Sequence, residues 1–194
     1  MKELFSMEKV VSGRYTAHTE DSFVVFIIGM RINRFWAVHR WLPVFMAMPG
    51  MIRELYMNPD LGFKEGHMHF SLRRTCIVQY WDSFEQLEHY ARKGQKHLKA
   101  WRDFNRKIGT DGTVGIFHET FIIPNGNSES VYNNMPVFGL AKATSHVPAT
   151  GRRETASRRL GRDGEPQAGP RRRAGRTHAC QSGTMTKNRN PKGS

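Results

Sequence analysis

The chain has 194 residues, of which 38% are hydrophobic, and a formal net charge of +13. This length allows one domain of ordinary size with extensions, and no apolar run approaches the roughly 20 residues that cross a bilayer. The two distant cysteines, Cys76 and Cys180, and the lack of an apolar signal segment in Met1–Thr19 argue against a secreted disulfide scaffold, so we expect a cytoplasmic protein without a membrane span.

The first half of the chain predicts a strand and a helix after a weakly ordered lead-in at 1–21. Residues Phe23–Ile32 read FVVFIIGMRI, which is typical of a strand buried on both faces at the centre of a sheet. Apolar residues then recur every three or four positions over Trp36–Met57, as on one face of a helix. Pro43 and Pro49 interrupt this pattern, so we expect either two helical pieces or one bent helix.

The residues that follow, up to Asn133, predict three further strands and two helices. Arg73-Arg74 is a natural hairpin tip between two strands, and Ser83 with Gln86 has the spacing of a capping box that begins a helix. A glycine, Gly94, separates this helix from the next one. The expected strands are Phe63–Ser71, Thr75–Trp81 and Val114–Ile123, with a short edge strand at Glu129–Asn133, and the last helix is expected at His97–Ile108.

The order β-α-β-β-α-β predicts an α+β fold of the ferredoxin-like, split βαβ type, with an antiparallel sheet and helices on one face. The central strands are apolar on both sides, so the other face needs a cover. We expect a second copy of the chain there, sheet against sheet, giving a homodimeric α+β barrel that encloses a ligand cavity. The domain is expected at 22–135, with an extension packed on it at 136–160.

The positive charge is concentrated near the end of the chain. Residues 151–194 carry 12 Lys and Arg against 3 Asp and Glu, whereas residues 1–150 carry 18 against 14. No aromatic residue follows Phe138, so this region has no large ring with which to anchor a core. We expect a disordered basic tail at 161–194 and no specific nucleic-acid partner.

The sequence lacks the motifs of classical hydrolases, NTPases and Rossmann dehydrogenases, namely GxSxG, the P-loop and GxGxxG. Polar residues within the apolar strands are therefore the candidate site residues, because a charged group there needs a partner or a cavity. Arg31 either pairs with Glu119 on the neighbouring strand or faces a ligand. His118 and Glu119 point to opposite faces, so one of the two sees the cavity, and the sequence does not say which. The remaining candidates for substrate binding are Trp36, His67, His69, Gln79, Trp81 and Asn133.

His67 and His69 lie on one face of a strand, as two metal ligands would, but the spacing fixes no third ligand. The alternative is that they are ordinary surface or core histidines, and we expect no metal. The tryptophans have a similar ambiguity, because aromatic residues at helical spacing usually belong to the core. Trp36 and Trp81 are the better candidates for cavity walls.

Long stretches of the chain resemble a family of bacterial and fungal proteins named after a polyketide monooxygenase of the fungal fumagillin pathway. The resemblance covers about residues 10–160. It is carried by the runs VVFIIGMRINRFWAVHRWLPVFMAMPGMIRELYMNPDLGF, TCIVQYWDSFEQLEHYAR, HLKAWRDFNRKIGTDGTVGIFHETF and ESVYNNMPVFGLAKA. It implies a dimeric α+β barrel related to the antibiotic-biosynthesis monooxygenases, several of which use neither metal nor flavin.

The resemblance implies a monooxygenase that oxidises a hydrophobic polyketide-like or phenolic molecule with O₂ and without a cofactor. From residue type alone, His118 is the expected base, Arg31 the group that stabilises the enolate, and Gln79 or Asn133 a ligand for substrate oxygens. Two alternatives stay open. Aldoxime dehydratases have the same kind of barrel, so a heme with His97 or His118 as axial ligand is one; a non-catalytic binder of small ligands is the other.

Overall fold

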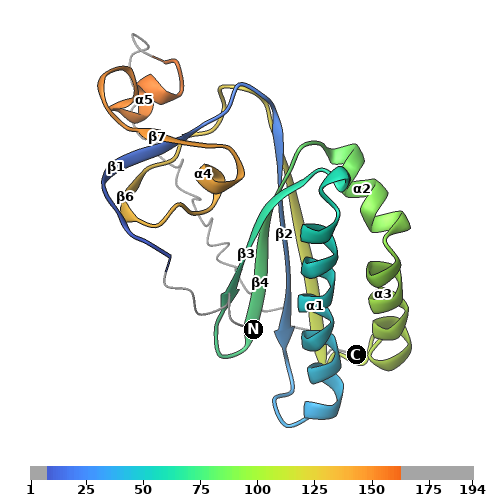
Figure 1. Cartoon of the computed structure of the whole chain (residues 1–194). Coiled ribbons are helices and arrows are strands. Elements are labelled where there is room, and N and C mark those ends of the chain that lie inside the picture. The colour runs from blue at the N-terminus through green and yellow to red at the C-terminus, as the bar shows by residue number, and fades with distance from the viewer. Residues whose placement is uncertain (1–7, 163–194) are drawn as a thin grey trace, which may run out of the picture. The chain divides into compact units, whose positions relative to one another are not determined.

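A four-stranded antiparallel sheet forms the centre of the fold in a computed structural model that describes residues 8–162. Its strands run in the order β3 (Phe63–Phe70), β4 (Arg74–Trp81), β2 (Phe23–Ile32) and β5 (Val114–Ile123), as Figure 1 shows. The strand β2 pairs with β4 on one side and β5 on the other. The apolar run that the sequence placed at the centre of a sheet is therefore a central strand, with the predicted bounds.

Three helices cover one face of this sheet: α1 (Val38–Met57), α2 (Phe84–Lys93) and α3 (Gln95–Lys107) (Figure 1). The predicted α+β, ferredoxin-like order is confirmed, with the second helical segment divided at Gly94. The predicted cap is present as well, because the side chain of Ser83 accepts a hydrogen bond from the backbone N–H of Gln86. Local sequence signals thus set where this helical layer begins and breaks.

The helix α1 is continuous through both Pro43 and Pro49, so the alternative of two separate helical pieces is wrong. A proline inside a helix removes one backbone hydrogen bond and costs about 3 kcal/mol. Apolar contacts with the sheet offset that cost on both sides of the prolines. The side chains of Phe45, Met48 and Ile52 pack into the same apolar core as strand residues.

A second, three-stranded sheet contains β6 (Tyr132–Met135), β1 (Val11–His18) and β7 (Ser145–Pro148) in that order. The expectation of a weakly ordered lead-in is therefore wrong for the residues of β1. Both of its partner strands lie more than 110 positions away in the sequence. The alternation of apolar and polar residues along β1 is interrupted by Gly13 and Arg14. The edge strand expected at Glu129–Asn133 is present as β6, shifted toward the C-terminus.

The described part ends in short elements. They are the helix α4 (Leu140–Ala143), a 3₁₀ turn at Gly151–Arg153 and the helix α5 (Ala156–Arg159), and a further 3₁₀ turn, Pro59–Leu61, follows α1. Strands β6 and β7 both pair with β1, so the boundary expected near residue 135 falls within one sheet. The tail predicted at 161–194 lies outside the described residues, apart from its first two positions.

No helix among residues 8–162 is long and apolar enough to span a membrane. The cytoplasmic location stays a prediction.

The two faces of the four-stranded sheet follow from the register. On β2, the even-numbered residues from Val24 to Met30 belong to the core under the helices, and we call this side the helix face. The odd-numbered residues point the other way, to what we call the open face. Arg31 pairs with Gly115, whereas Glu119 pairs with Ile27. The ion pair considered between Arg31 and Glu119 is therefore wrong, because the register separates the two residues by four positions along β5.

Candidate functional site

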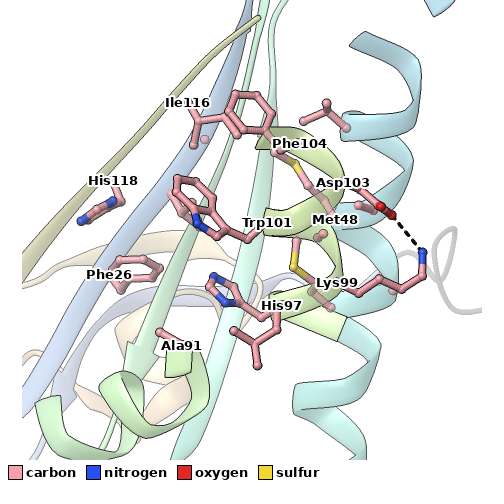
Figure 2. A pocket seen from close by; sticks show the side chains of 18 of the residues that line it. Phe26, Met48, Ala91, His97, Lys99, Trp101, Asp103, Phe104, Ile116 and His118 are labelled. Carbon is pink, nitrogen blue, oxygen red and sulfur yellow. Dashed lines mark hydrogen bonds and ion pairs between the residues drawn. The ribbon is translucent and has the colours of Figure 1, made fainter. Parts of the chain in front are cut away.

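A cavity of about 1000 Å³ lies on the helix face, between the sheet and the three helices. Its floor comes from β2 and β5, and its walls come from all three helices (Figure 2). The helix α3 packs on α1 and α2, which leaves space between α3 and β5. We expected a cavity on the open face, between two copies of the chain. This cavity is lined by the elements of one chain, and a cavity between two copies stays a prediction.

Most of the cavity wall is apolar. Side chains from the sheet and from α1 and α3 supply it: Phe26, Ile28, Ile116, Met48, Met51, Trp101 and Phe104. The wall is open toward β5, the edge strand, where Ile116 and Trp101 are exposed. An apolar hollow of this size with few polar groups is typical of a site for a small hydrophobic ligand.

His118 on β5 is one of two imidazoles at this cavity (Figure 2). It pairs with Ile28 in the strand register, which turns its side chain to the helix face. The ring lies 5.7 Å from the ring of Phe26, measured between centroids. The structure thus answers a question that the sequence left open: His118 sees the cavity, and Glu119 points to the open face.

His97 on α3 is the second imidazole, and it enters the cavity from the opposite wall (Figure 2). Its ring lies 5.9 Å from that of Tyr90. The Nδ1 atom of His97 is buried and has no hydrogen-bond partner among the described residues. Buried polar atoms normally have a partner, so a hydrogen bond from a ligand to this nitrogen would remove an unfavourable burial.

Four of the charged residues that line the cavity are held in ion pairs. The Nζ atom of Lys99 lies 2.9 Å from a carboxylate oxygen of Asp103, and Arg92 lies 2.7 Å from Glu88. The hydrogen bond from Lys99 is the main reason that the pKa of Asp103 lies below its ordinary value. These pairs are partly exposed, so they mark the rim of the cavity rather than its apolar interior.

The other predicted site residues do not join His118 in this cavity. Gln79 and Trp81 are on the helix face but are buried in the core, and the Trp81 Nε1–H donates to Gln79 Oε1 over 2.9 Å. Arg31 is exposed on the opposite face from His118. The expected joint action of Arg31 and His118 on one substrate is therefore wrong within a single chain. Trp36 is 81% exposed, in the loop before α1, and does not line the cavity.

Three of the predicted residues lie elsewhere. His67 and His69 project to the open face from β3, with ring centroids 4.9 Å apart, as their spacing predicted. Asn133 lies on β6, in the other sheet. Among residues 8–162, no group of three or more His, Cys, Asp or Glu side chains is arranged to hold a metal ion.

A smaller and more polar cavity of about 430 Å³ adjoins His67. Its centre is the buried carboxylate of Glu65, which accepts a 2.5 Å hydrogen bond from the Tyr56 hydroxyl and lies 3.4 Å from Lys142 on α4. Burial is the main cause that lowers the pKa of His67, followed by the nearby His69. The Nδ1 atom of His67 is buried and has no hydrogen-bond partner among residues 8–162. Tyr56, Glu65 and Lys142 satisfy one another, and they join α4 to the four-stranded sheet.

Sequence reasoning did not identify the walls of the large cavity. Trp101 and Phe104 have the spacing of a buried helical stripe, so the sequence does not distinguish them from ordinary core residues. Periodicity shows which side of a helix is turned inward. It does not show whether that side meets other side chains or an empty space.

Comparison with known proteins supports the fold and identifies a family. Residues 23–140, more than half of the chain, match a family model described as monooxygenase af470-like. No curated protein matches the chain significantly.

Among solved structures, an aldoxime dehydratase, OxdRE, crystallised with butyraldoxime, has a TM-score of 0.57 and 19% identity over 70% of this chain and 41% of its own. Another aldoxime dehydratase has a TM-score of 0.58 and 20% identity over 74% of this chain and 45% of its own. The chain thus spans less than half the length of these enzymes, and the likeness shows the fold alone. SnoaB, a cofactor-independent oxygenase from Streptomyces nogalater, matches with a TM-score of 0.37 and 11% identity over 52% of this chain and 91% of its own.

Proposed function

Because this chain belongs to the monooxygenase af470-like family, we propose that it oxidises a hydrophobic polyketide-like or phenolic molecule with O₂. The observation that carries the proposal is the helix-face cavity of about 1000 Å³, with the His118 imidazole on its wall. Its apolar surface suits a ligand with several rings, and its few polar groups suit a ligand with a small number of oxygen atoms.

In this mechanism, His118 acts as the general base. A neutral imidazole can accept a proton from an acidic C–H or O–H of the substrate. The resulting carbanion transfers an electron to O₂, and the two radicals combine to form a hydroperoxide. Loss of water then converts a substrate CH₂ into a carbonyl: one oxygen atom enters the product and the other leaves as water. No external reductant is needed.

His97 binds the substrate in this proposal. Its ring lines the same cavity as His118, from the other wall, and a rotation of the ring would turn the buried Nδ1, which has no partner among residues 8–162, toward the ligand. A hydrogen bond between this nitrogen and a substrate oxygen would satisfy the buried atom and orient the rings. The substrate proposed is therefore one that carries two separated polar groups on an apolar skeleton.

A homodimer belongs to the proposal, with a second copy covering the open face. Phe117 and Phe121 on that face are 40% and 46% exposed, and Val25 and Ile27 lie beside them on β2. Apolar side chains gathered on one sheet face are typical of a protein interface. The dimer covers the apolar part of this face around Phe117 and Phe121, while the substrate occupies the cavity under the helices of each subunit.

The two imidazoles also favour a second candidate, a heme-binding enzyme. The cavity fits such a group: its walls are apolar, and either His97, through its unpartnered Nδ1, or His118 would hold the iron. A heme would supply redox chemistry at the iron, while the residues of this chain would bind and enclose it. An absorption spectrum of the purified protein separates the candidates, because a Soret band indicates heme and a colourless protein favours the oxidation without a cofactor.

Oxygen uptake tests the proposed function. Anthrone is a suitable first probe, because its CH₂ group is acidified by two rings and a carbonyl, and simple phenols complete the panel. We expect the protein to accelerate O₂ consumption and to form the quinone, with one atom of labelled oxygen in the product. Binding of these molecules without any oxygen uptake would show instead a non-catalytic binder of small ligands.

A further inference from the structure

One end of the four-stranded sheet carries exposed apolar side chains next to arginines. The β3–β4 hairpin and the loop between β2 and α1 meet there: the backbone N–H of Ile32 donates to the carbonyl of Arg73 over 2.8 Å, and the Arg73 guanidinium lies 6.0 Å from the Phe35 ring centroid. We define the hairpin-end patch by six residues. They are Trp36, Phe70, Leu72, Arg31, Arg73 and Arg74.

The apolar members of the hairpin-end patch are among the most exposed apolar side chains of the described chain. Trp36 and Leu72 are each 81% exposed, and Phe70 is 63% exposed. Trp36 and Leu72 occupy the two neighbouring loops, so they project from the same end of the sheet. The transfer of a large apolar side chain from water into an apolar phase lowers the free energy.

The charged members of the patch have no acidic partner among residues 8–162. Residues 31–53 and 66–81 contain no Asp or Glu at all. The nearby Asp111 pairs with Arg40 over 2.9 Å. The hydrogen bond from the backbone N–H of Thr113 is the main cause that lowers the pKa of Asp111, and the charges of Arg40 and Arg34 lower it further. Among the described residues, Arg31, Arg73 and Arg74 have no carboxylate within 4 Å.

Two of these arginines also face each other. Arg31 on β2 and Arg74 on β4 are directly paired in the strand register, and both are exposed. Like charges in such a cross-strand pair are destabilising. A phosphate group placed between them would remove the repulsion, so this pair favours an anionic ligand.

From this combination we propose that the hairpin-end patch docks the protein on an anionic phospholipid bilayer. Leu72 and Phe70 would enter the acyl boundary, Trp36 would lie at the headgroup level, and the arginines would contact phosphates. A nucleic acid or an acidic protein would satisfy the arginines but would leave the aliphatic tip of the hairpin in water. The membrane accounts for both halves of the patch.

The patch is connected to the cavity by α1. Trp36 lies immediately before this helix, and Pro43 and Met46 within it line the cavity. A hydrophobic molecule dissolved in the bilayer would thus be close to the cavity of a docked protein. The membrane proposal does not depend on the oxidation chemistry, so either of the two can fail without the other.

Vesicle flotation of the full chain tests the proposal. The vesicles are pure phosphatidylcholine or contain about one-third phosphatidylglycerol. We expect binding to the anionic vesicles, and the double variant W36S/L72S should lower the partition coefficient about tenfold or more. The matched control M57S/I122S removes two side chains of similar exposure, 68% and 63%, from other parts of the surface, and it should change binding less than about twofold.

A second pair of variants tests the charges. R73Q/R74Q should weaken binding about 30-fold, since each arginine near an anionic surface contributes about 1 kcal/mol. The control R53Q/R102Q removes two exposed arginines from α1 and α3 and should have a smaller effect. Every variant keeps residues 163–194, so any attraction from that basic segment is the same in all of them.

Three results would overturn the proposal. One is no binding of the full chain to anionic vesicles, and another is equal binding by W36S/L72S and the unaltered chain. The third is binding to RNA or to an acidic protein that W36S/L72S weakens while vesicle binding is absent. A tryptophan quenching experiment with brominated lipids adds a direct readout, because quenching should fall markedly in W36F.

Discussion

The two faces of the four-stranded sheet look alike in the sequence and differ in the structure. On β5, the alternate residues His118 and Thr120 line a cavity under the helices, whereas Phe117, Glu119 and Phe121 project to the open face. Apolar composition alone suggested that the open face holds the ligand. The comparison teaches that a helical layer can itself leave a hollow, so the covered face of a sheet is not necessarily a filled core.

The largest expected difference between the two faces is in how a substitution on each face changes the rate of oxidation. Replacing His118 with Ala should lower kcat/KM about 10²- to 10⁴-fold, because a positioned general base contributes that much to proton abstraction. The matched control is Glu119→Gln, one residue away on the open face, which should change kcat/KM by less than about threefold. Oxygen uptake with anthrone measures both. Equal losses in the two variants would show that the cavity is not the reacting site.

The next effect concerns association. Replacing Phe121 with Asp places a charge on the open face, and its desolvation should weaken a homodimer about 100-fold or more. Ile122→Asp is the control, since this 63% exposed residue lies on the other face of the same strand. Sedimentation velocity over a range of concentrations gives the dissociation constants. A chain that is monomeric before any substitution contradicts the proposed interface.

A third prediction concerns packing on the open face at Gly29. A Cβ atom there would lie 2.5 Å from the carbonyl oxygen of Thr75 and 2.7 Å from the Phe117 ring. Gly29→Ala should therefore destabilise the fold by about 1–3 kcal/mol, because the strands must shift. Gly50→Ala, whose Cβ meets nothing within 4 Å in α1, should instead stabilise it by about 0.5–1 kcal/mol. Urea unfolding of both variants, with equal m-values, provides the comparison.

The smallest expected effect is a dependence of the free energy of unfolding on pH, caused by His67 at the edge of the open face. Burial and the neighbour His69 hold the pKa of His67 below its ordinary value, with Glu65 acting in the opposite direction and Lys142 in the same one. The unfolded chain then binds a proton at a pH where the folded chain does not. Stability should fall as the pH drops through about 6.5, the ordinary value, toward the folded pKa.

Replacing His67 with Gln should reduce this acid-dependent loss, whereas His89→Gln, at an exposed position on α2, serves as the control. Unfolding midpoints between about pH 5 and 8 cover the range in which a histidine titrates. An unchanged slope in the His67 variant would mean that other groups cause the acid sensitivity.

Local patterns were sufficient for most of the fold. The uniform apolar character of β2, the Ser83 cap and the turn glycines each act over a few residues, so the sequence shows them directly. Strand β1 was missed because its partners come from residues 132–148, and pairing over that distance leaves no local signal. The continuity of α1 was uncertain because packing, rather than propensity, offsets its two prolines.

The site was predicted less well than the fold. The sequence selected His118 because a titratable group in an apolar strand is unusual, and that reasoning needs no tertiary information. Side chains alternate between the two faces along a strand, so Arg31 and His118 could be assigned to opposite faces only once the register of β2 and β5 was known. Trp81 and Gln79 were also misplaced, since a buried indole N–H paired with an amide looks the same in sequence as a cavity wall.

A crystal structure of the full chain soaked with anthrone tests the central claim most directly. The account predicts electron density for the three rings under the helices, between His118 on β5 and Trp101 on α3, with a ligand oxygen within hydrogen-bonding distance of His97 Nδ1. Density for the ligand against Ile27 and Phe117 on the open face, with the space under the helices filled by side chains, would contradict it.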